Sequence, residues 1–199
     1  MNVRHYMHAD ITTVPPDAPL SGARDVMDQR GFGLLLVRDA DGRLAGFITR
    51  AGLKEIKDWN QPVSKMAHRV QFSVSPSDTL EKAALIMLSN RLVLLPVVED
   101  DKLAGVITQS ELLRGLTVGL GIGLEATRFS IRLGDGEAEI YDVLDVLRKH
   151  EARLVSLTRR PVDERTSEVI VRVQQVEDKE RLRSDLEAAL GETDDRTDG

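Results

Sequence analysis

Cysteine is absent from this chain of 199 residues, and aromatic residues make up only 4% of it. Without cysteine there can be no disulfide bond, no thiolate nucleophile and no thiolate metal site, which suits a reducing cytoplasm. No apolar run approaches the roughly 18 residues that a membrane-spanning helix needs. The N-terminus MNVRHYMHAD also lacks the apolar segment of a signal peptide. We therefore expect a cytoplasmic protein with no membrane partner and a core of Leu, Val, Ile, Ala and Met.

The net charge of −6 arises in the last third of the chain. Residues 1–124 hold 14 basic and 14 acidic residues, whereas residues 125–199 hold 13 and 19. An acidic chain with few aromatics is poorly suited to bind nucleic acid through its phosphates, so we expect no nucleic-acid partner. The terminal GETDDRTDG, residues 191–199, has no apolar residue, and its composition predicts a disordered acidic tail.

The first 117 residues contain an internal repeat. LAGFITR at 44–50 returns as LAGVITQ at 103–109, and TVPPDAPLSGARDVM at 13–27 aligns with SVSPSDTLEKAALIM at 73–87. Each copy spans about 55–60 residues and reads as an extended stretch, an amphipathic helix, an apolar strand, a turn, a second strand and a second helix. Because two copies are fewer than the three that a solenoid usually needs, we expect a pseudo-two-fold pair.

This pattern resembles the CBS domain, and a tandem pair of such domains resembles a Bateman module. The resemblance rests on TVPPDAPL and SVSPSDTL, on LLPVVEDDKLAGVIT and on the helix QSELLRGL. The resemblance implies that the protein catalyses no reaction. It also implies that the cleft between the repeats binds a regulatory ligand, an adenosine compound such as AMP, ADP, ATP or S-adenosylmethionine. The ribose would meet a Ser or Thr hydroxyl and the carboxylate three residues later, and the phosphates would face a helix N-terminus.

Carried over to this chain, the resemblance implies a ligand site at Thr108 and Glu111 in the second copy. The other residues implied to line this site are Val70, Gln71, Phe72 and the segment from Leu94 to Pro96. In the first copy it implies Thr49, with Thr12 nearby and with Arg50 as a phosphate contact; Arg69 and Arg4 are further possible phosphate contacts.

Both copies depart from the family pattern. Gly52 takes the place of the carboxylate in the first copy, and Glu111 is one methylene longer than the usual Asp. An alternative explains the second pair without a ligand: in TQSE, Thr108 can accept from the N–H of Glu111 while Glu111 accepts from the N–H of Thr108, as in a capping box. Both interpretations stay open on the sequence alone.

After the glycine-rich segment GLTVGLGIGL the pattern changes. TRFSIRL, ARLVSLTRR and SEVIVRVQQV alternate as strands, and AEIYDVLDVLRKH and DKERLRSDLEAAL have helical periodicity. Strand, helix, strand, strand, helix resembles the ACT domain, a ferredoxin-like fold. The order of a CBS pair followed by an ACT-like domain is similar to the acetoin-utilisation B-type proteins.

The last strand of that fold is not visible in the sequence. A three-stranded sheet would leave an unprotected edge, which predicts dimerisation through residues 125–190. The resemblance also implies an amino-acid site between the first strand and helix, near Asp135–Glu139, although Ala138 stands at the expected glycine position.

We find no pattern of a catalytic or metal site, and expect none. The four histidines do not recur with carboxylates at metal spacing, and no serine sits in a nucleophile elbow.

We expect an α/β (α+β) chain with a first CBS repeat at 1–58, a second at 59–117, a linker at 118–124 and an ACT-like domain at 125–190. The expected function is ligand sensing, with the signal passed to a homodimer. The alternative is an interaction scaffold with no small ligand that regulates an unknown partner protein.

Overall fold

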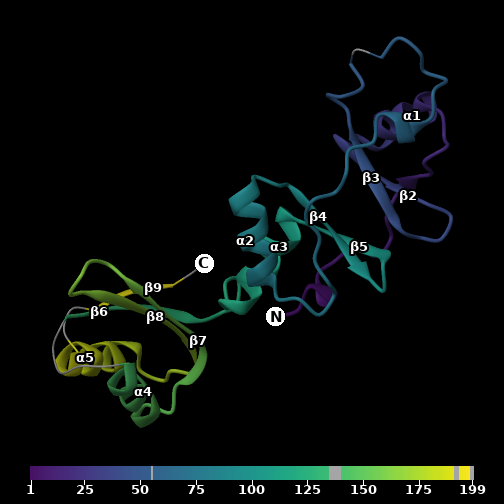
Figure 1. Cartoon of the computed structure of the whole chain (residues 1–199). Helices are drawn as coiled ribbons and strands as arrows, with labels where there is room; N and C mark the ends of the chain where they lie inside the picture. Colours follow the sequence, from purple (N-terminus) through teal and green to yellow (C-terminus); the bar gives the residue numbers. More distant parts are fainter. Residues whose placement is uncertain (55, 135–139, 191–192, 198–199) are drawn as a thin grey trace. The chain divides into compact units, whose positions relative to one another are not determined.

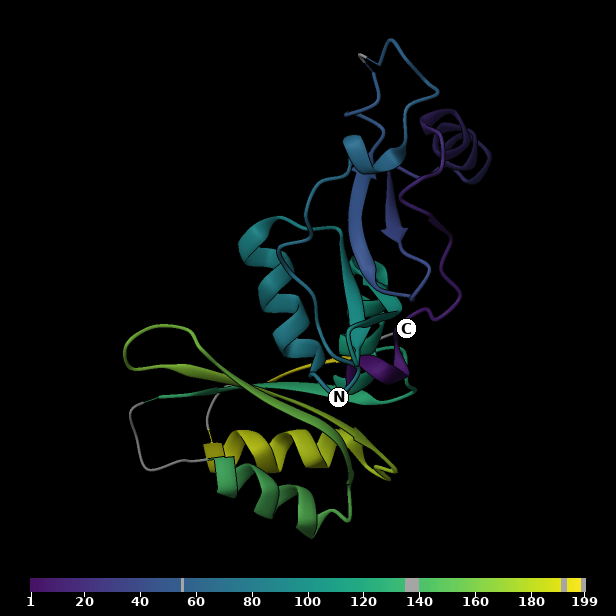
Figure 2. The ribbon, with the colours of Figure 1, turned by 45° about the vertical axis from the view of Figure 1, so that its right-hand side comes forward.

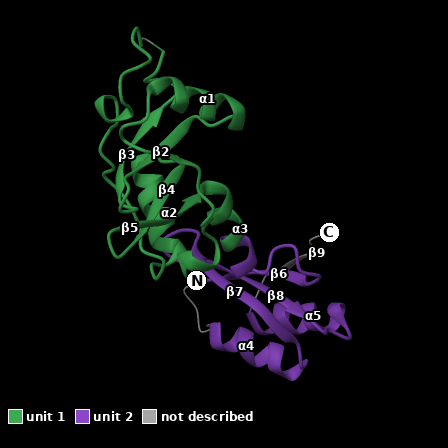
Figure 3. Cartoon of the chain, turned by 90° about the vertical axis from the view of Figure 1, so that its right-hand side faces the viewer, with its two compact units in different colours: residues 1–115 green, residues 116–199 purple. Residues whose placement is uncertain are grey.

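The computed structural model describes residues 1–54, 56–134, 140–190 and 193–197. The chain divides into two compact units, residues 1–115 and 116–199 (Figure 3). Each unit has its own buried core. Among the described residues, no helix is both long and apolar enough to cross a membrane.

Unit 1 contains both repeats (Figure 1). The first is built from β1 Thr13–Val14, α1 Leu20–Arg30, β2 Leu34–Arg38 and β3 Leu44–Thr49. The second is built from α2 Leu80–Asn90, β4 Leu94–Glu99, β5 Lys102–Thr108 and α3 Gln109–Gly119, and the last turn of α3 lies beyond Gly115, the end of unit 1. Two short 3-10 turns, η1 Val3–His5 and η2 Val63–Lys65, precede the repeats. Strands β2 and β3 form one antiparallel hairpin, and β4 and β5 form the other.

The helices of the repeats follow from their apolar spacing. Leu20, Ala23 and Met27 are buried in α1, as are their counterparts in α2. Both helices end at a residue in the left-handed conformation, Gly31 in the first copy and Arg91 in the second.

The repeats differ after the second strand, where the sequence predicts a helix in each copy. α3 begins directly after β5, but residues 51–54 form turns. Gly52 weakens any helix there, because glycine has a low helix propensity.

The repeats exchange their leading segments. Val3 of η1 packs in the core of the second repeat, and its N–H donates to the carbonyl of Asp78 at 2.9 Å. Val63 of η2 packs in the core of the first repeat, where its N–H donates to Ala18 at 2.8 Å. Each core therefore needs a segment that is adjacent in sequence to the other repeat.

This exchange explains the glycine of the repeated LAG phrase. The backbone of His68 pairs with β3 beside Gly46, and that of His8 pairs with β5 beside Gly105. A Cβ at either glycine would lie 2.7 Å from the carbonyl oxygen of that histidine. No larger residue fits without moving the exchanged segment.

Unit 2 is a ferredoxin-like sandwich. Its elements are β6 Thr127–Leu133, α4 Ile140–Lys149, β7 Arg153–Pro161, β8 Ser167–Gln174, α5 Lys179–Leu190 and β9 Thr193–Thr197. The sheet order is β7-β8-β6-β9, so the first and third strands are central. Figure 2 shows α4 and α5 on the same face of this sheet.

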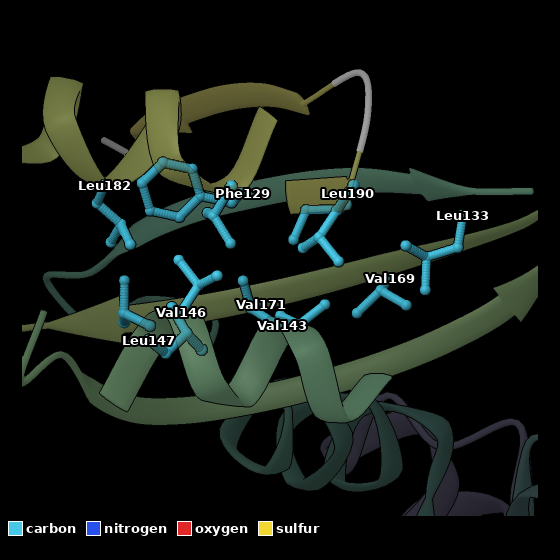
Figure 4. Packing of buried hydrophobic residues seen from close by; sticks show 12 residues of the cluster. Phe129, Leu133, Val143, Val146, Leu147, Val169, Val171, Leu182 and Leu190 are labelled. Carbon is cyan, nitrogen blue, oxygen red and sulfur yellow. The ribbon is translucent and has the colours of Figure 1, made fainter. Parts of the chain in front are cut away.

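The core of unit 2 lies between that face and the two helices (Figure 4). Alternate residues of β6 and β8 point into it, among them Phe129 and Val171, both with no exposed surface. They meet Val143 of α4 and Leu182 of α5, as the predicted helical faces require.

Two sequence expectations for the C-terminal region are wrong. Residues 193–197 are not a disordered tail, and the sheet does not lack its last strand, because β9 pairs antiparallel with β6. The pairing uses backbone groups of β6 that would otherwise be unpaired, and it requires no apolar pattern. The predicted amino-acid loop at residues 135–139 lies outside the described residues.

The glycine-rich segment is held in place. α3 continues to Gly119, and the next carbonyl, that of Leu120, accepts from Ser156 Oγ of β7 at 2.7 Å. Gly121 has a φ of +67°, and a Cβ there would lie 2.5 Å from Val155. The segment thus packs against its own sheet instead of running free.

Candidate functional site

Two clefts lie where the strands of the two repeats meet. A small apolar cluster joins the repeats here, with Leu36, Leu103 and Val106 buried and partly buried neighbours from both repeats. Both clefts share Leu34, Leu36 and Leu94.

The large cleft has a volume of about 610 Å³. Its walls are apolar strand residues from both repeats, with Phe47 and Phe72 among the lining side chains. The ring of Phe47 lies 5.5 Å from that of His68, measured between centroids. The polar lining comprises His68, Arg69, Gln71, Asn90 and Arg91.

The small cleft has a volume of about 250 Å³. It is lined by the segment that precedes β1 and by strand residues, namely His8, Asp10, Ile11, Thr12, Phe32, Leu34, Leu36, Leu94, Val106 and Thr108. Residues 8–12 correspond to residues 68–72 of the large cleft at the repeat offset of 60. The two clefts therefore occupy equivalent places in the pseudo-symmetric pair.

Thr108 and Glu111 form a tight polar group beside the small cleft. The Glu111 carboxylate accepts from the N–H of Thr108 at 3.2 Å and from the Thr108 hydroxyl. Its other oxygen lies 2.9 Å from Nε2 of His8. Burial raises the pKa of Glu111, but the hydrogen bonds from Thr108 and His8 outweigh it, so that pKa lies below its ordinary value.

This is half of the predicted capping box. Glu111 does reach back to the N–H of Thr108, but the Thr108 hydroxyl donates to the Glu111 carboxylate. The first repeat shows the other half, because Thr49 Oγ1 accepts from the N–H of Gly52 at 3.1 Å. The Thr108 hydroxyl therefore acts as a donor because the carboxylate of Glu111 is present, whereas the Thr49 hydroxyl acts as an acceptor because Gly52 has no side chain.

Arg50 is engaged within the first repeat. Its Nη2 donates to the carbonyl of Met27 at 2.7 Å and its Nε to that of Phe32 at 3.3 Å, while Nη1 pairs with Asp28. The side chain thereby satisfies the C-terminal end of α1. Arg4 is likewise paired, with Glu99 at 2.5 Å.

The structure divides the predicted ligand site between the two clefts. Val70, Gln71, Phe72, Leu94 and Pro96 line the large one, whereas Thr108 and Thr12 line the small one together with Leu94. Thr108 therefore lines a different cleft from residues 70–72, and the assignment of these residues to a ligand stays a prediction. The leading segments are exchanged, so the segment before β1 lies against β5.

Some lining residues were not expected from the sequence. His8 and Asp10 could have been found by applying the offset of 60 to residues 68–70. No sequence pattern indicated that Arg91 lines the cleft, because its position depends on the left-handed turn that ends α2. Among the described residues, no group of three metal-ligating side chains occurs.

Comparison with known proteins places these clefts in context. The curated relatives include the inosine-5'-monophosphate dehydrogenase of Methanocaldococcus jannaschii, 31% identical over 106 residues. That match covers 53% of this chain but 21% of the enzyme, so the chain spans about a fifth of that relative's length and resembles it only through its CBS part.

Solved structures agree on the fold. A CBS domain pair/ACT domain protein of Thermotoga maritima superposes with a TM-score of 0.54 at 25% identity, covering 58% of this chain and 96% of that one. CBSX2, solved in complex with AMP, gives a TM-score of 0.54 at 24% identity, covering 58% and 95%. The family model for the CBS domain matches residues 3–57 and 63–117, more than half of the sequence. This chain therefore belongs to the CBS domain family, as a tandem pair.

Proposed function

We propose that this chain is a regulatory protein that senses an adenosine compound, an adenine nucleotide or an adenosyl ligand, in the clefts between its two CBS repeats. The observation that carries the proposal is the pair of equivalent clefts, each lined by apolar residues of both repeats together with a few polar side chains. An apolar slot with a few polar groups suits a flat base attached to a polar sugar.

The signal would pass to unit 2. α3 begins next to Thr108 and ends at Gly119, and the following carbonyl is held by Ser156. A ligand can act only through different affinities for two arrangements of the protein, and one continuous helix is a simple element to shift.

Unit 2 would act as an ACT-like dimerisation domain. β9 covers the edge of β6, so a second copy would pair with the opposite edge of the sheet. There β7, with nine residues, has a sheet partner on one side only among the described residues. An open edge of that length favours pairing with a second copy.

The test is thermal unfolding with AMP, ADP, ATP or S-adenosylmethionine, AMP first because CBSX2 was solved with it. A ligand that binds only the folded state, at about 100 times its dissociation constant, adds roughly 2.7 kcal/mol and raises the midpoint by several degrees. The variants are Thr108→Ala and Glu111→Ala at the small cleft. Thr49→Ala is the matched control, because its hydroxyl bonds to the N–H of Gly52 and the residue lines neither cleft. The proposal fails when none of the four ligands at millimolar concentration shifts the wild-type midpoint.

A second function is an interaction scaffold that regulates a partner enzyme without a small ligand. The contacts of Thr108, Glu111 and His8 favour it, because they satisfy the carboxylate within the fold. On this proposal the midpoint falls in Thr108→Ala and Glu111→Ala, and no nucleotide changes it in any variant. Retention of the same partner with and without nucleotide would support it further.

A further inference from the structure

The two clefts are equivalent in position but opposite in charge. Two arginines and a histidine line the large cleft, and its lining contains no Asp or Glu among the described residues. The lining of the small cleft contains Asp10 and, over the same described residues, no Lys or Arg. Glu111 lies next to it, in contact with the lining residues Thr108 and His8.

The backbone fixes both arginines of the large cleft. Arg69 follows His68, whose N–H donates to Phe47 at 2.8 Å. Arg91 is the left-handed C-cap of α2, with a φ of 53° and its N–H bonded to carbonyls of the last turn. Neither guanidinium forms an ion pair with any part of the chain that the structure describes. Two exposed cations without a counter-ion at one cleft favour an anionic ligand, and arginine matches phosphate geometry especially well.

No such cation is found among the described residues that line the small cleft. Arg50 donates to the carbonyl of Phe32, a residue that lines the small cleft, but this arginine already forms an ion pair with Asp28. Asp10 is exposed, and over the part of the chain that the structure describes the imidazole of His8 is the one possible cationic partner of Glu111. A phosphate ester would meet carboxylates here, so this cleft favours an uncharged or cationic ligand.

We infer that the two clefts sort ligands by charge. The large cleft takes phosphate-bearing adenosine compounds through Arg69 and Arg91, and the small cleft takes uncharged or cationic adenosyl compounds. This inference rests on the proposed function and assigns a ligand class to each cleft. It gives one chain two inputs, because an adenine nucleotide and S-adenosylmethionine would not compete for one place.

The test is isothermal titration calorimetry with AMP, adenosine and S-adenosylmethionine. The large-cleft variant is Arg69→Gln with Arg91→Asn, since Asn tolerates the left-handed conformation. The small-cleft variant is Asp10→Asn, and Arg38→Gln, at the exposed end of β2 and outside both clefts, is the matched control.

We expect the double variant to bind AMP about tenfold or more weakly, since a loss of about 1.4 kcal/mol is tenfold in affinity. Its affinity for adenosine and S-adenosylmethionine should stay within about twofold, the scale of a surface charge that does not touch the ligand. Asp10→Asn should weaken S-adenosylmethionine by about threefold or more and leave AMP unchanged, as expected for one exposed charge pair. Arg38→Gln should change none of the three.

A second readout needs no variant. Wild-type affinity for AMP should fall between about 50 mM and about 300 mM KCl, while that for adenosine should not, because salt screens exposed charges. If AMP binds the double variant as tightly as wild type, the sorting by charge is wrong and the proposed function stands. If none of the three compounds binds the wild-type protein, both are wrong.

Discussion

The glycine of the repeated LAG phrase is required by a close backbone contact in each repeat. The sequence shows that LAG recurs, but the reason for its glycine lies in a segment about 22 residues downstream of Gly46 and another far upstream of Gly105. The carbonyls of His68 and His8 occupy the space of a Cβ. A pattern of apolar and polar residues cannot reveal such a backbone approach, since it involves no side chain.

Gly105→Ala is expected to destabilise unit 1. The new Cβ would lie 2.7 Å from the His8 carbonyl oxygen and 3.2 Å from Met7 Sδ, so the exchanged segment must move. Overpacking of this kind costs about 1–3 kcal/mol, measurable by urea unfolding. Gly33→Ala is the control, because nothing lies within 4 Å of its Cβ position. Equal stability of the two variants would contradict the exchange seen here.

Asp78 should make unit 1 sensitive to acid. Its carboxylate accepts from Lys82 Nζ at 2.8 Å and from the N–H of Ser75 at 2.8 Å, and these bonds hold its pKa below the ordinary value. A lowered folded-state pKa gives stability that is present above the unfolded pKa of about 3.9 and lost as pH falls through the folded pKa.

Asp78→Asn tests that dependence, because the amide oxygen can still accept from Ser75 while the charge is lost. We expect the variant to be less stable by roughly 0.5–1 kcal/mol at neutral pH, the scale of a partly exposed ion pair. The difference should shrink as pH falls through the lowered folded-state pKa of Asp78 and vanish below it, where both side chains are neutral. A difference that is constant over this range in urea titrations would show that the charge plays no part.

At the scale of elements, periodicity predicted most of the fold. The strands β2 to β8 and the helices α1 to α5 follow segments that the sequence marks as apolar and periodic. β9 was missed because TDDRT has no apolar alternation, and its pairing with β6 depends on backbone groups. The same limit applies to the clefts: residue types suggested Thr108 and Phe72, but only the exchanged segments decide which cleft each one lines.

A proline in β9 should expose the edge of β6. Asp195 pairs with Phe129, and proline removes a backbone donor and disfavours an interior strand position. We expect Asp195→Pro to lower the midpoint of unit 2 and to speed hydrogen exchange at β6 amides, with β7 less affected. Asp195→Asn keeps the N–H and serves as the control. Unchanged exchange in the proline variant would mean that β9 contributes nothing to the sheet's stability.

At the scale of the whole molecule, each unit has a task of its own in the proposed function. The cores of unit 1 draw on residues 3–112 and that of unit 2 on residues 129–190. The clefts belong to the first, and the open edge of β7 belongs to the second. Ligand binding and dimerisation should therefore leave separate signatures on unfolding.

Calorimetric unfolding should accordingly resolve two transitions that respond to different variables. Ligand should raise the transition of unit 1, since mass action stabilises the state that binds. Protein concentration should raise the transition of unit 2, because a dimer is favoured as its concentration rises. Asp195→Pro, which affects unit 2, identifies the transition of that unit.

A unit 2 midpoint that stays constant over about a hundredfold range of concentration would exclude the dimer, since mass action requires a shift. A unit 2 midpoint that also rises with ligand would reveal coupling between the two units, which is what a sensor that passes a signal along α3 requires.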